Sequence, residues 1–361
     1  MVAATHRSNR LVPGGSAPDD LPVPRRPVVH RPAGGPHWMQ ISVTIATHNR
    51  VALLLQTLDS LRQVDWRPLG RPPEIVVVDN VCTDGTRAQV EAWAGRHGYE
   101  GSRPVAGGTV VRCADGTEAS FRLVREQRLG LGWARQRCVE EARGEIVAFL
   151  DDDVLVSRGW AQGLATAFTA RDVQVVCGRV TGSWQACPRP AWLPPDLEWV
   201  VSVFDLGEKM FRQHRPDGIG ANFAVRKEVF GKIGGFRGDL GRHGRKLTGG
   251  EELELFQRMR RAAVQGAYCG EMHVAHWIPA ERLHREYFSR VGYCHGRSRI
   301  AIHGRGRGLS YLRKVAAHTA LFCGYGAAAC WARCRRDETN FRRWLVRAQT
   351  GRGGIAALAR R

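Results

Sequence analysis

The sequence lacks several features that would assign it to a common class of protein. Its ten cysteines include no CxxC pair and no regular framework, so in a chain of 361 residues they indicate reduced thiols and a cytoplasmic protein. The N-terminal region has no apolar core of a secretory signal peptide. Residues 1–38 are instead rich in Pro, Gly, Arg and Ser, which predicts a disordered N-terminal tail.

Two glycine-rich phosphate-binding loops are also missing. The sequence has no GxxxxGK[ST] loop, and no GxGxxG follows the first predicted strand, so P-loop and dinucleotide-binding folds lack their phosphate cradles. Gly130-Leu-Gly132 resembles part of such a loop, but no strand directly precedes it. A bound phosphate would therefore be held by a metal ion and by cationic side chains.

No run of apolar residues is long enough for a clear membrane span. Residues 315–332 come nearest, but they are rich in small side chains, include His318 and fall short of the roughly 20 apolar residues that a span needs. We therefore expect a packed or interfacial helix in this segment.

Positive charge is what the chain has in excess, with 54 Lys and Arg against 34 Asp and Glu and a formal net charge of +20. Such a charge predicts attraction to nucleic acid, to an anionic membrane or to phosphorylated small molecules. The arginines are dispersed along the chain, so a general compositional bias is the simpler interpretation. The apolar content of 43% is ordinary for a globular protein and permits a sizeable core.

The first half of the chain alternates between predicted strands and helices. Strands are expected at 41–46 and 74–78, each followed by an amphipathic helix, which is typical of a parallel sheet. Asp115-Gly116 lies between two alternating segments and predicts a hairpin. Another strand is expected at 145–150, directly before three consecutive aspartates.

Those aspartates, Asp151, Asp152 and Asp153, are the strongest chemical signal in the sequence. Adjacent carboxylates repel one another, so a folded protein needs a cation or hydrogen-bond donors to hold them together. Their hard oxygens suit Mg²⁺ or Mn²⁺, particularly where phosphate groups share the metal. The pattern predicts a divalent-metal and phosphate site at the carboxyl end of a central strand.

Polar residues follow three of the predicted strands, and parallel strands would bring these ends to one edge of the sheet. An aspartate after a single strand would more simply be a helix cap, but three such ends in consecutive units favour a shared pocket. They are Thr47 with Asn49, Asp79 with Asn80, and Asp151 to Asp153.

In combination and in order, the motifs resemble the family 2 inverting glycosyltransferases with a GT-A fold. They lie at 41–50, 76–86, 129–135, 149–153 and 249–255. The resemblance implies an α/β fold with a Rossmann-like, mostly parallel central sheet flanked by helices. We expect this domain at 39–308, followed by a basic helical C-terminal extension at 309–361, for which membrane association is one alternative.

The resemblance also implies roles for individual residues. Asp153 would bind the metal, Asp151 would contact the metal or the nucleotide, and Glu252 would be the catalytic base. The sequence has Glu251-Glu252 where the family usually has Glu-Asp, so the choice of base between the two glutamates stays open. Other nucleotide-sugar-binding residues would be Thr47, Asn49, Asp79, Arg135, Asp152, Asn222 and Glu251.

Three further features have more than one interpretation. His276 follows a predicted strand and could complete the metal site, although a single histidine is more often structural and His273-x-x-His276 is no zinc signature. The Trp-rich segment 184–199 could face a sugar or lipid acceptor, or pack in the core. The basic helix at 282–307 could meet anionic lipid headgroups or simply face water.

The function implied by the resemblance is metal-dependent transfer of a sugar, with inversion, from a nucleotide-sugar donor to a hydroxyl acceptor. Mg²⁺ or Mn²⁺ would stabilise the diphosphate leaving group, and one carboxylate would take the acceptor's proton. The acceptor would be a glycan or lipid-linked, in bacterial cell-surface glycan or glycolipid synthesis, in the cytoplasm or at the inner face of the cell membrane. Alternatives are an inactive sugar-nucleotide-binding scaffold and a nucleic-acid-binding protein, although the latter leaves the aspartates unexplained.

Overall fold

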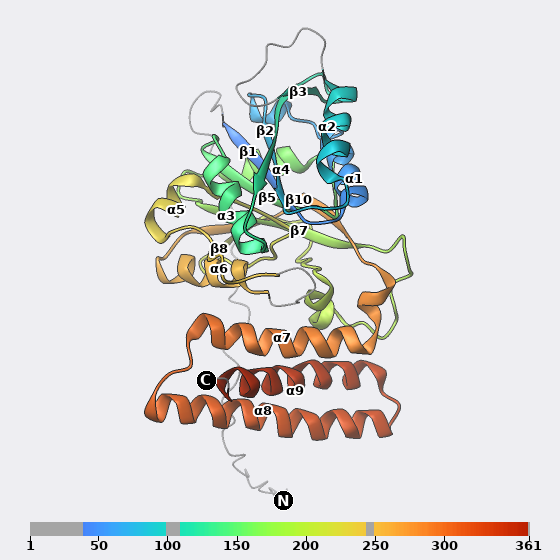
Figure 1. The fold of residues 1–361 in the computed structure, drawn as a ribbon, viewed down its shortest axis with the longest axis vertical. Helices are drawn as coiled ribbons and strands as arrows, with labels where there is room; N and C mark the ends of the chain where they lie inside the picture. Colours follow the sequence, from blue (N-terminus) through green and yellow to red (C-terminus); the bar gives the residue numbers. More distant parts are fainter. Residues whose placement is uncertain (1–38, 99–108, 243–248, 360–361) are drawn as a thin grey trace, which may run out of the picture.

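The computed structural model describes residues 39–98, 109–242 and 249–359, so the predicted disordered tail lies outside the described residues. A large sheet with helices on both faces forms one part of the molecule, and a layer of three long helices forms the other (Figure 1). The α/β class and the C-terminal helices predicted from the sequence are both confirmed.

Four neighbouring strands of the sheet run parallel, in the order β4-β2-β1-β5. The register places Thr47 of β1 beside Asp79 of β2, and Ala46 of β1 beside Asp151 of β5. The three polar strand ends therefore meet at one edge, as predicted. The bounds are β1 Ile41–Thr47, β2 Glu74–Asn80, β4 Glu118–Glu126 and β5 Ile146–Asp151.

The predicted hairpin is also confirmed, because β3 (Thr109–Arg112) pairs antiparallel with β4. The other half of the sheet is mixed. The strand β9 (Asn222–Arg226) runs antiparallel to both β5 and β7 (Val175–Ser183). Two short strands complete it, β6 (Val154–Val156) and β8 (Phe211–Gln213), and both pair antiparallel with β10 (Gly266–Trp277).

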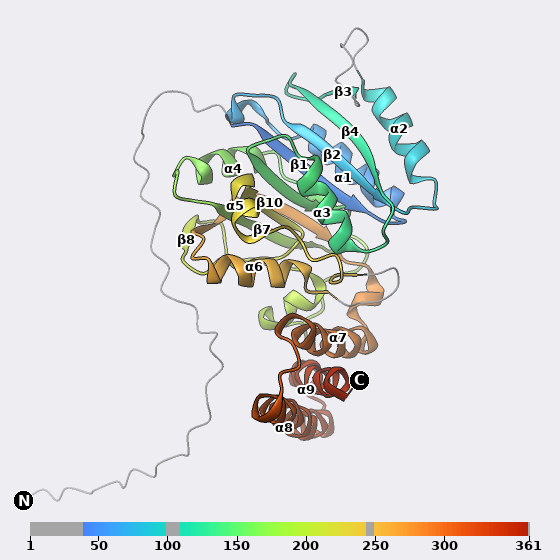
Figure 2. The same cartoon turned by 60° about the vertical axis from the view of Figure 1, so that its left-hand side comes forward.

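Helices cover the two faces of this sheet (Figure 2). Alternate residues of each strand point to opposite faces, so the strands contribute to two separate apolar clusters. One cluster includes α1 (Val51–Arg62), α2 (Thr86–His97) and α4 (Trp160–Phe168). The other includes α3 (Leu131–Glu141), α5 (Lys227–Ile233) and α6 (Glu251–Arg261).

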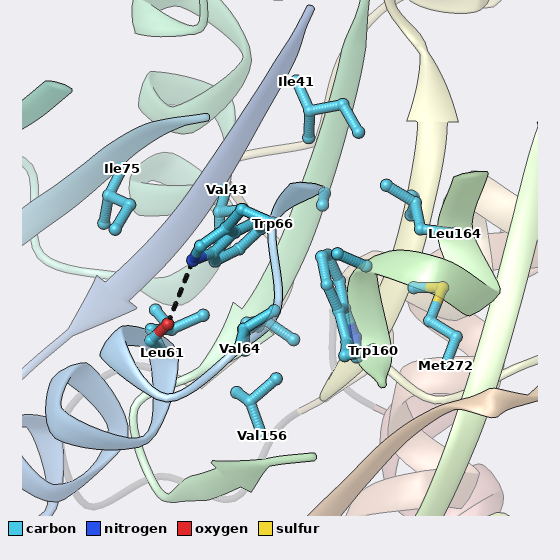
Figure 3. Packing of buried hydrophobic residues seen from close by; sticks show 14 of the residues in the cluster. Ile41, Val43, Leu61, Val64, Trp66, Ile75, Val156, Trp160, Leu164 and Met272 are labelled. Carbon is cyan, nitrogen blue, oxygen red and sulfur yellow. Dashed lines mark hydrogen bonds between the residues drawn. The ribbon is translucent and has the colours of Figure 1, made fainter. Parts of the chain in front are cut away.

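Two tryptophans pack edge to face in the first cluster, between α4 and the segment after α1 (Figure 3). The ring centroids of Trp66 and Trp160 are 6.0 Å apart, and both side chains are buried. The indole of Trp66 donates a hydrogen bond to the carbonyl oxygen of Leu61 at 3.2 Å. This contact fixes the end of α1, the helix that begins beside the polar strand ends.

The C-terminal layer consists of α7 (Arg285–His303), α8 (Gly308–Cys334) and α9 (Glu338–Ala359), with α9 between the other two (Figure 1). Glycines permit this close packing: an added Cβ at Gly296 of α7 would lie 2.0 Å from the carbonyl oxygen of Thr350 on α9. The segment predicted as one helix at 282–307 is divided, because the short 3₁₀ helix Ala280–Leu283 precedes α7 and the next helix starts at Gly308.

Among the described residues, no helix combines the length and the apolar character that crossing a membrane requires.

Candidate active site

A cavity of about 470 Å³ opens at the edge where the polar strand ends meet. The ends of β1 and β5 form one side, through Thr47, Asp151 and Asp152. The N-terminus of α6 provides Glu251 and Glu252, and α7 provides a further wall. The hydroxyl of Thr47 donates to Oδ2 of Asp152 at 2.8 Å, which ties the first strand to the aspartate cluster.

Asp151, Asp153 and His276 come together as a candidate metal site. One ligand atom from each of the three lies within 4.8 Å of the others. The antiparallel pairing of β6 with β10 places His276 opposite Val154, directly after the aspartates, and Nε2 of His276 lies 3.3 Å from Oδ1 of Asp153.

The donors of this site fit a hard divalent cation. Two carboxylates and an imidazole are ligands that Mn²⁺ accepts, and Mg²⁺ favours the carboxylates. Oδ1 of Asp153 is buried and receives no hydrogen bond of good geometry in the described part of the chain. The charge of this oxygen is therefore directed toward the place where a metal ion would lie.

Two arginines and His276 lie beside the aspartates. Arg50 lies 2.9 Å from Oδ1 of Asp152 and 2.6 Å from Oδ2 of Asp153. Burial alone would raise the pKa of Asp153, but His276 and Arg50 outweigh it and hold that pKa well below its usual value. The second arginine is Arg282, whose guanidinium lies 3.7 Å from Oδ2 of Asp153. Burial raises the pKa of Asp152 to about 6, even though Arg50 opposes the increase.

Arg135 joins the aspartates to the glutamates. Its two terminal nitrogens lie 2.9 Å from Oδ1 of Asp151 and 2.6 Å from Oε1 of Glu251. It also donates to the carbonyl oxygen of Gly220 at 2.9 Å. Burial would lower the pKa of Arg135, but Glu251 and Asp151 outweigh it and raise the pKa above its ordinary value. The guanidinium is thus a fixed positive charge within the cavity wall.

The two adjacent glutamates differ sharply in their surroundings. Gly250 has a φ of 109° and begins the turn that directs both side chains toward the cavity. The Glu251 side chain is 2% exposed, and burial together with Glu252 raises its pKa to about 8. The Glu252 side chain is 28% exposed and lines the cavity, and its Oε2 lies 3.8 Å from Nη1 of Arg135. Glu252 is therefore the more available carboxylate.

Three predicted binding residues have other contacts. Oδ1 of Asn49 accepts a hydrogen bond from the Thr83 amide at 2.7 Å, outside the cavity lining. Asp79 is buried and accepts a hydrogen bond from the Cys82 amide, while its neighbour Asn80 lines the cavity.

Asn222 is the third of these residues, and it lies in the core. It is 0% exposed and does not line the cavity. Its oxygen accepts a hydrogen bond from the Trp160 indole at 3.0 Å. Its nitrogen donates to the carbonyl oxygens of Arg179 and Met272 at 3.0 and 2.7 Å. All three contacts join neighbouring elements of the fold.

The sequence analysis missed several residues that line or support the cavity. Arg50 directly follows a polar strand end, so its position in the sequence could have suggested a role beside the aspartates. His295 of α7 was also missed; its ring centroid lies 5.2 Å from that of Trp199, which ends the Trp-rich segment considered for the acceptor and lines the cavity. Their meeting depends on how the C-terminal helices pack, which no local sequence pattern indicates.

The model of the family described as glycosyl transferase family 2 matches residues 42–234 of the chain. This match covers more than half of the 361 residues. The chain belongs to glycosyl transferase family 2. The aspartate cluster and the glutamates at the start of α6 are accordingly parts of a glycosyltransferase.

Two curated proteins are similar to this chain in sequence. The glucosyl-dolichyl phosphate glucuronosyltransferase of Haloferax volcanii is 24% identical over 224 residues, and the alignment spans 61% of this chain and 63% of that protein. The succinoglycan biosynthesis protein ExoM of Rhizobium meliloti is 25% identical over 328 residues, which cover 89% and 93% of the two chains.

A solved structure has the same fold. The mannosyltransferase PcManGT from Pyrobaculum calidifontis, in complex with GDP-Man and Mn²⁺, aligns with a TM-score of 0.53 and 20% identity, over 86% of each chain. The central, mostly parallel sheet of this glycosyltransferase is therefore that of the GT-A fold, as the sequence motifs predicted.

Proposed function

We propose that this glycosyltransferase moves a sugar from a nucleotide-sugar donor to a hydroxyl acceptor, with a divalent metal ion and with inversion at the anomeric carbon. The observation that carries the proposal is the position of Arg135, whose guanidinium lies between Asp151 and the pair Glu251 and Glu252. Asp151, on the side proposed for the donor, and Glu252, the proposed base, thereby line the same cavity.

On the donor side, Asp151, Asp153 and His276 would hold Mg²⁺ or Mn²⁺. The bound ion would supply a Lewis acid that stabilises the negative charge on the departing diphosphate. Thr47 and Arg50 hold Asp152 by hydrogen bonding and ion pairing, which keeps this wall of the cavity rigid.

On the acceptor side, Glu252 is the proposed general base. Its side chain is partly exposed and lines the cavity, so the carboxylate can accept the proton of the acceptor hydroxyl while that oxygen attacks the anomeric carbon. Direct attack from the face opposite the leaving diphosphate inverts the configuration, and no carboxylate nucleophile is needed. Glu251 is a positioning residue, because its short contact with Arg135 fixes the guanidinium beside the base.

The names of the two relatives support a class of acceptor. One is named for a dolichyl phosphate substrate and the other for succinoglycan biosynthesis, so one acts on a lipid-linked molecule and the other serves polysaccharide synthesis. We therefore propose a glycan or lipid-linked acceptor in cell-surface glycan synthesis, with the enzyme working at the inner face of the cell membrane.

The test begins with a thermal-shift screen of UDP-, GDP- and dTDP-sugars with Mn²⁺ or Mg²⁺, because a ligand of the native state raises its stability. The donor that binds is then used in transfer assays with wild type, Glu252→Gln and the exposed control Glu91→Gln. We expect Glu252→Gln to lower kcat by about 10²–10⁴-fold with little change in donor affinity, and Glu91→Gln to remain active.

Product analysis completes the test. An NMR coupling constant of the anomeric proton should report the configuration opposite to that of the donor. Retained configuration, or normal turnover by Glu252→Gln, would contradict the proposed mechanism.

A further inference from the structure

The outer helix of the C-terminal layer carries most of the exposed large apolar side chains in the described part of the chain. Of six such side chains, Leu309, Leu312, Phe322 and Trp331 all belong to α8. Leu309, Leu312 and Trp331 are 60–63% exposed. Apolar side chains gathered on one element in this way mark an interaction surface.

Leu309 and Leu312 belong to an apolar face of α8, whose border carries Trp331 and the exposed Arg313. Exposed residues recur along α8 at intervals of three and four, which places them on one side of the helix. The face begins with Leu309, Leu312, Ala316 and Ala320 and continues through Cys323, Ala327, Cys330 and Cys334. At about 1.5 Å per residue, the 27 residues of α8 present it over roughly 40 Å.

The opposite side of α8 packs on α9, so the apolar face points away from the protein (Figures 1 and 2). A groove of about 550 Å³ adjoins the apolar face. Small and aromatic side chains line it, including Ala317, Gly324 and Tyr325 of α8 and Trp344 of α9. The rings of Tyr325 and Trp344 stack at 5.4 Å. The groove is apolar and open at the same surface.

Cationic side chains flank the apolar face at both ends. Arg305 and Arg307 precede α8, Arg333 lies in its last turn, and Arg335 and Arg336 follow; all five are exposed. The whole segment 287–336 contains ten Lys and Arg residues and no Asp or Glu. Exposed apolar side chains between clusters of arginine, without acidic residues, are complementary to the surface of an anionic membrane.

We propose that the exposed face of α8 binds the surface of an anionic lipid bilayer, with the helix lying parallel to the membrane. The apolar face would enter the boundary between headgroups and acyl chains, and the arginines would contact lipid phosphates. Trp331, which lies under the guanidinium of Arg335 at 4.9 Å, has the amphipathic ring that favours this boundary. A second copy of the chain is disfavoured as the occupant, because pairing two such faces would bring like charges together.

With α8 lying on the membrane, the orientation of the protein is compatible with catalysis. The cavity has a wall from α7, and α9 separates α7 from α8 (Figure 1). Packed helix axes are about 8–10 Å apart, so α7 would lie about 20 Å above α8. This inference rests on the proposed location at the membrane and assigns the contact to the exposed face of α8. Vesicle binding needs neither donor nor acceptor, so its failure can be distinguished from a failure of the proposed reaction.

The test is cosedimentation of the full chain with vesicles of phosphatidylglycerol and phosphatidylcholine, or of phosphatidylcholine alone. Wild type should bind the anionic vesicles at least 10-fold more tightly than the neutral ones. Ala316→Glu/Ala320→Glu, on the exposed face of α8, should weaken binding to the anionic vesicles at least 10-fold. The matched control is Ala88→Glu/Ala92→Glu, which makes the same change of charge on an exposed face of α2 and should bind as wild type does.

The native cysteines provide a second measurement. Cys323, Cys330 and Cys334 are exposed on the apolar face, whereas Cys82 and Cys187 belong to the globular domain. Anionic vesicles should slow alkylation of the first three by a charged maleimide, as read by mass spectrometry, and leave the other two unchanged. Equal loss of binding by both double variants would overturn the proposal, as would protection of the α8 cysteines by dimerisation without lipid.

Discussion

Nη1 of Arg135 lies 2.6 Å from Oε1 of Glu251, and both side chains are almost completely buried. Partners so far apart in the sequence are joined because α3 and α6 begin at the same edge of the sheet. The same guanidinium reaches Asp151, whose side chain is 28% exposed. Arg135 therefore donates one hydrogen bond to the buried carboxyl group of Glu251 and another to the more exposed Asp151, and mutation can separate these two contacts.

Arg135→Met should destabilise the protein by about 1–3 kcal/mol, because it removes the buried donor that serves Glu251 and the carbonyl oxygen of Gly220. The double variant Arg135→Met/Glu251→Met should recover most of that loss, yet both variants should be inactive because Glu252 loses its positioned neighbour. Urea denaturation and transfer assays measure the two effects. The control is Arg137→Met, whose partner Glu141 lies one helical turn away on α3. A double variant no more stable than the single one would contradict this account.

His276 and His273 provide a matched pair for testing the metal site. Both belong to β10, but His276 lies beside Asp153 whereas His273 contacts the hydroxyl of Thr181 at 2.8 Å. His276→Ala should weaken Mn²⁺ binding at least about 10-fold, since it removes a donor. His273→Ala should leave the affinity unchanged. Electron paramagnetic resonance titration measures free Mn²⁺ directly, and equal affinities for the two variants would exclude His276 as a ligand.

Removing the metal ion should have a matching effect on transfer. Dialysis against EDTA should abolish activity in wild type and in His273→Ala, and added Mn²⁺ or Mg²⁺ should restore it in both. His276→Ala should need a higher Mn²⁺ concentration for half-maximal activity. Full activity after complete metal removal would overturn the proposal of a metal-dependent reaction.

His295 should make the stability of the protein sensitive to acid. Burial, with Arg299 nearby, lowers its pKa from 6.5 to about 4. Between these values the unfolded chain binds a proton that the folded protein does not, so stability is full above pH 6.5 and falls as the pH decreases toward 4. The side chain is only half-buried, so the loss due to His295 should be about 1–2 kcal/mol.

The variant His295→Asn isolates this contribution from those of the other histidines. Urea midpoints at pH 7 and pH 4.5 should differ less in the variant than in wild type. Identical pH dependence of the two proteins would show that the imidazole is protonated equally in the folded and unfolded states.

The aspartate cluster could be predicted from the sequence because strand ends are local features and parallel pairing brings them together. The register of β1, β2 and β5 follows from that rule. The environment of His276 could not be derived in this way, since it depends on the antiparallel pairing of β6 with a strand more than a hundred residues later. The same limit applies to Arg282, whose burial beside Asp153 results from a turn after that strand.

Asn222 illustrates how a matching motif leaves the role of a side chain open. The resemblance implied that it binds the nucleotide sugar, whereas its amide joins α4, β7 and β10 through three hydrogen bonds. Asn222→Ala would leave those partners buried without hydrogen bonds, so we expect a loss of about 3–5 kcal/mol in unfolding free energy, at 1–3 kcal/mol for each unsatisfied group. The KM for the donor should change little.

Gly178→Ala provides an independent route to the same prediction. A Cβ at Gly178 would lie 2.2 Å from Nδ2 of Asn222, so the added methyl group would displace the amide without removing it. Both variants should therefore lower the urea midpoint, while the exposed control Gln89→Ala on α2 should keep the stability of wild type. If Asn222→Ala were instead as stable as wild type but raised the donor KM more than 10-fold, Asn222 would contribute to binding, and its position in the core would have to change when the donor binds.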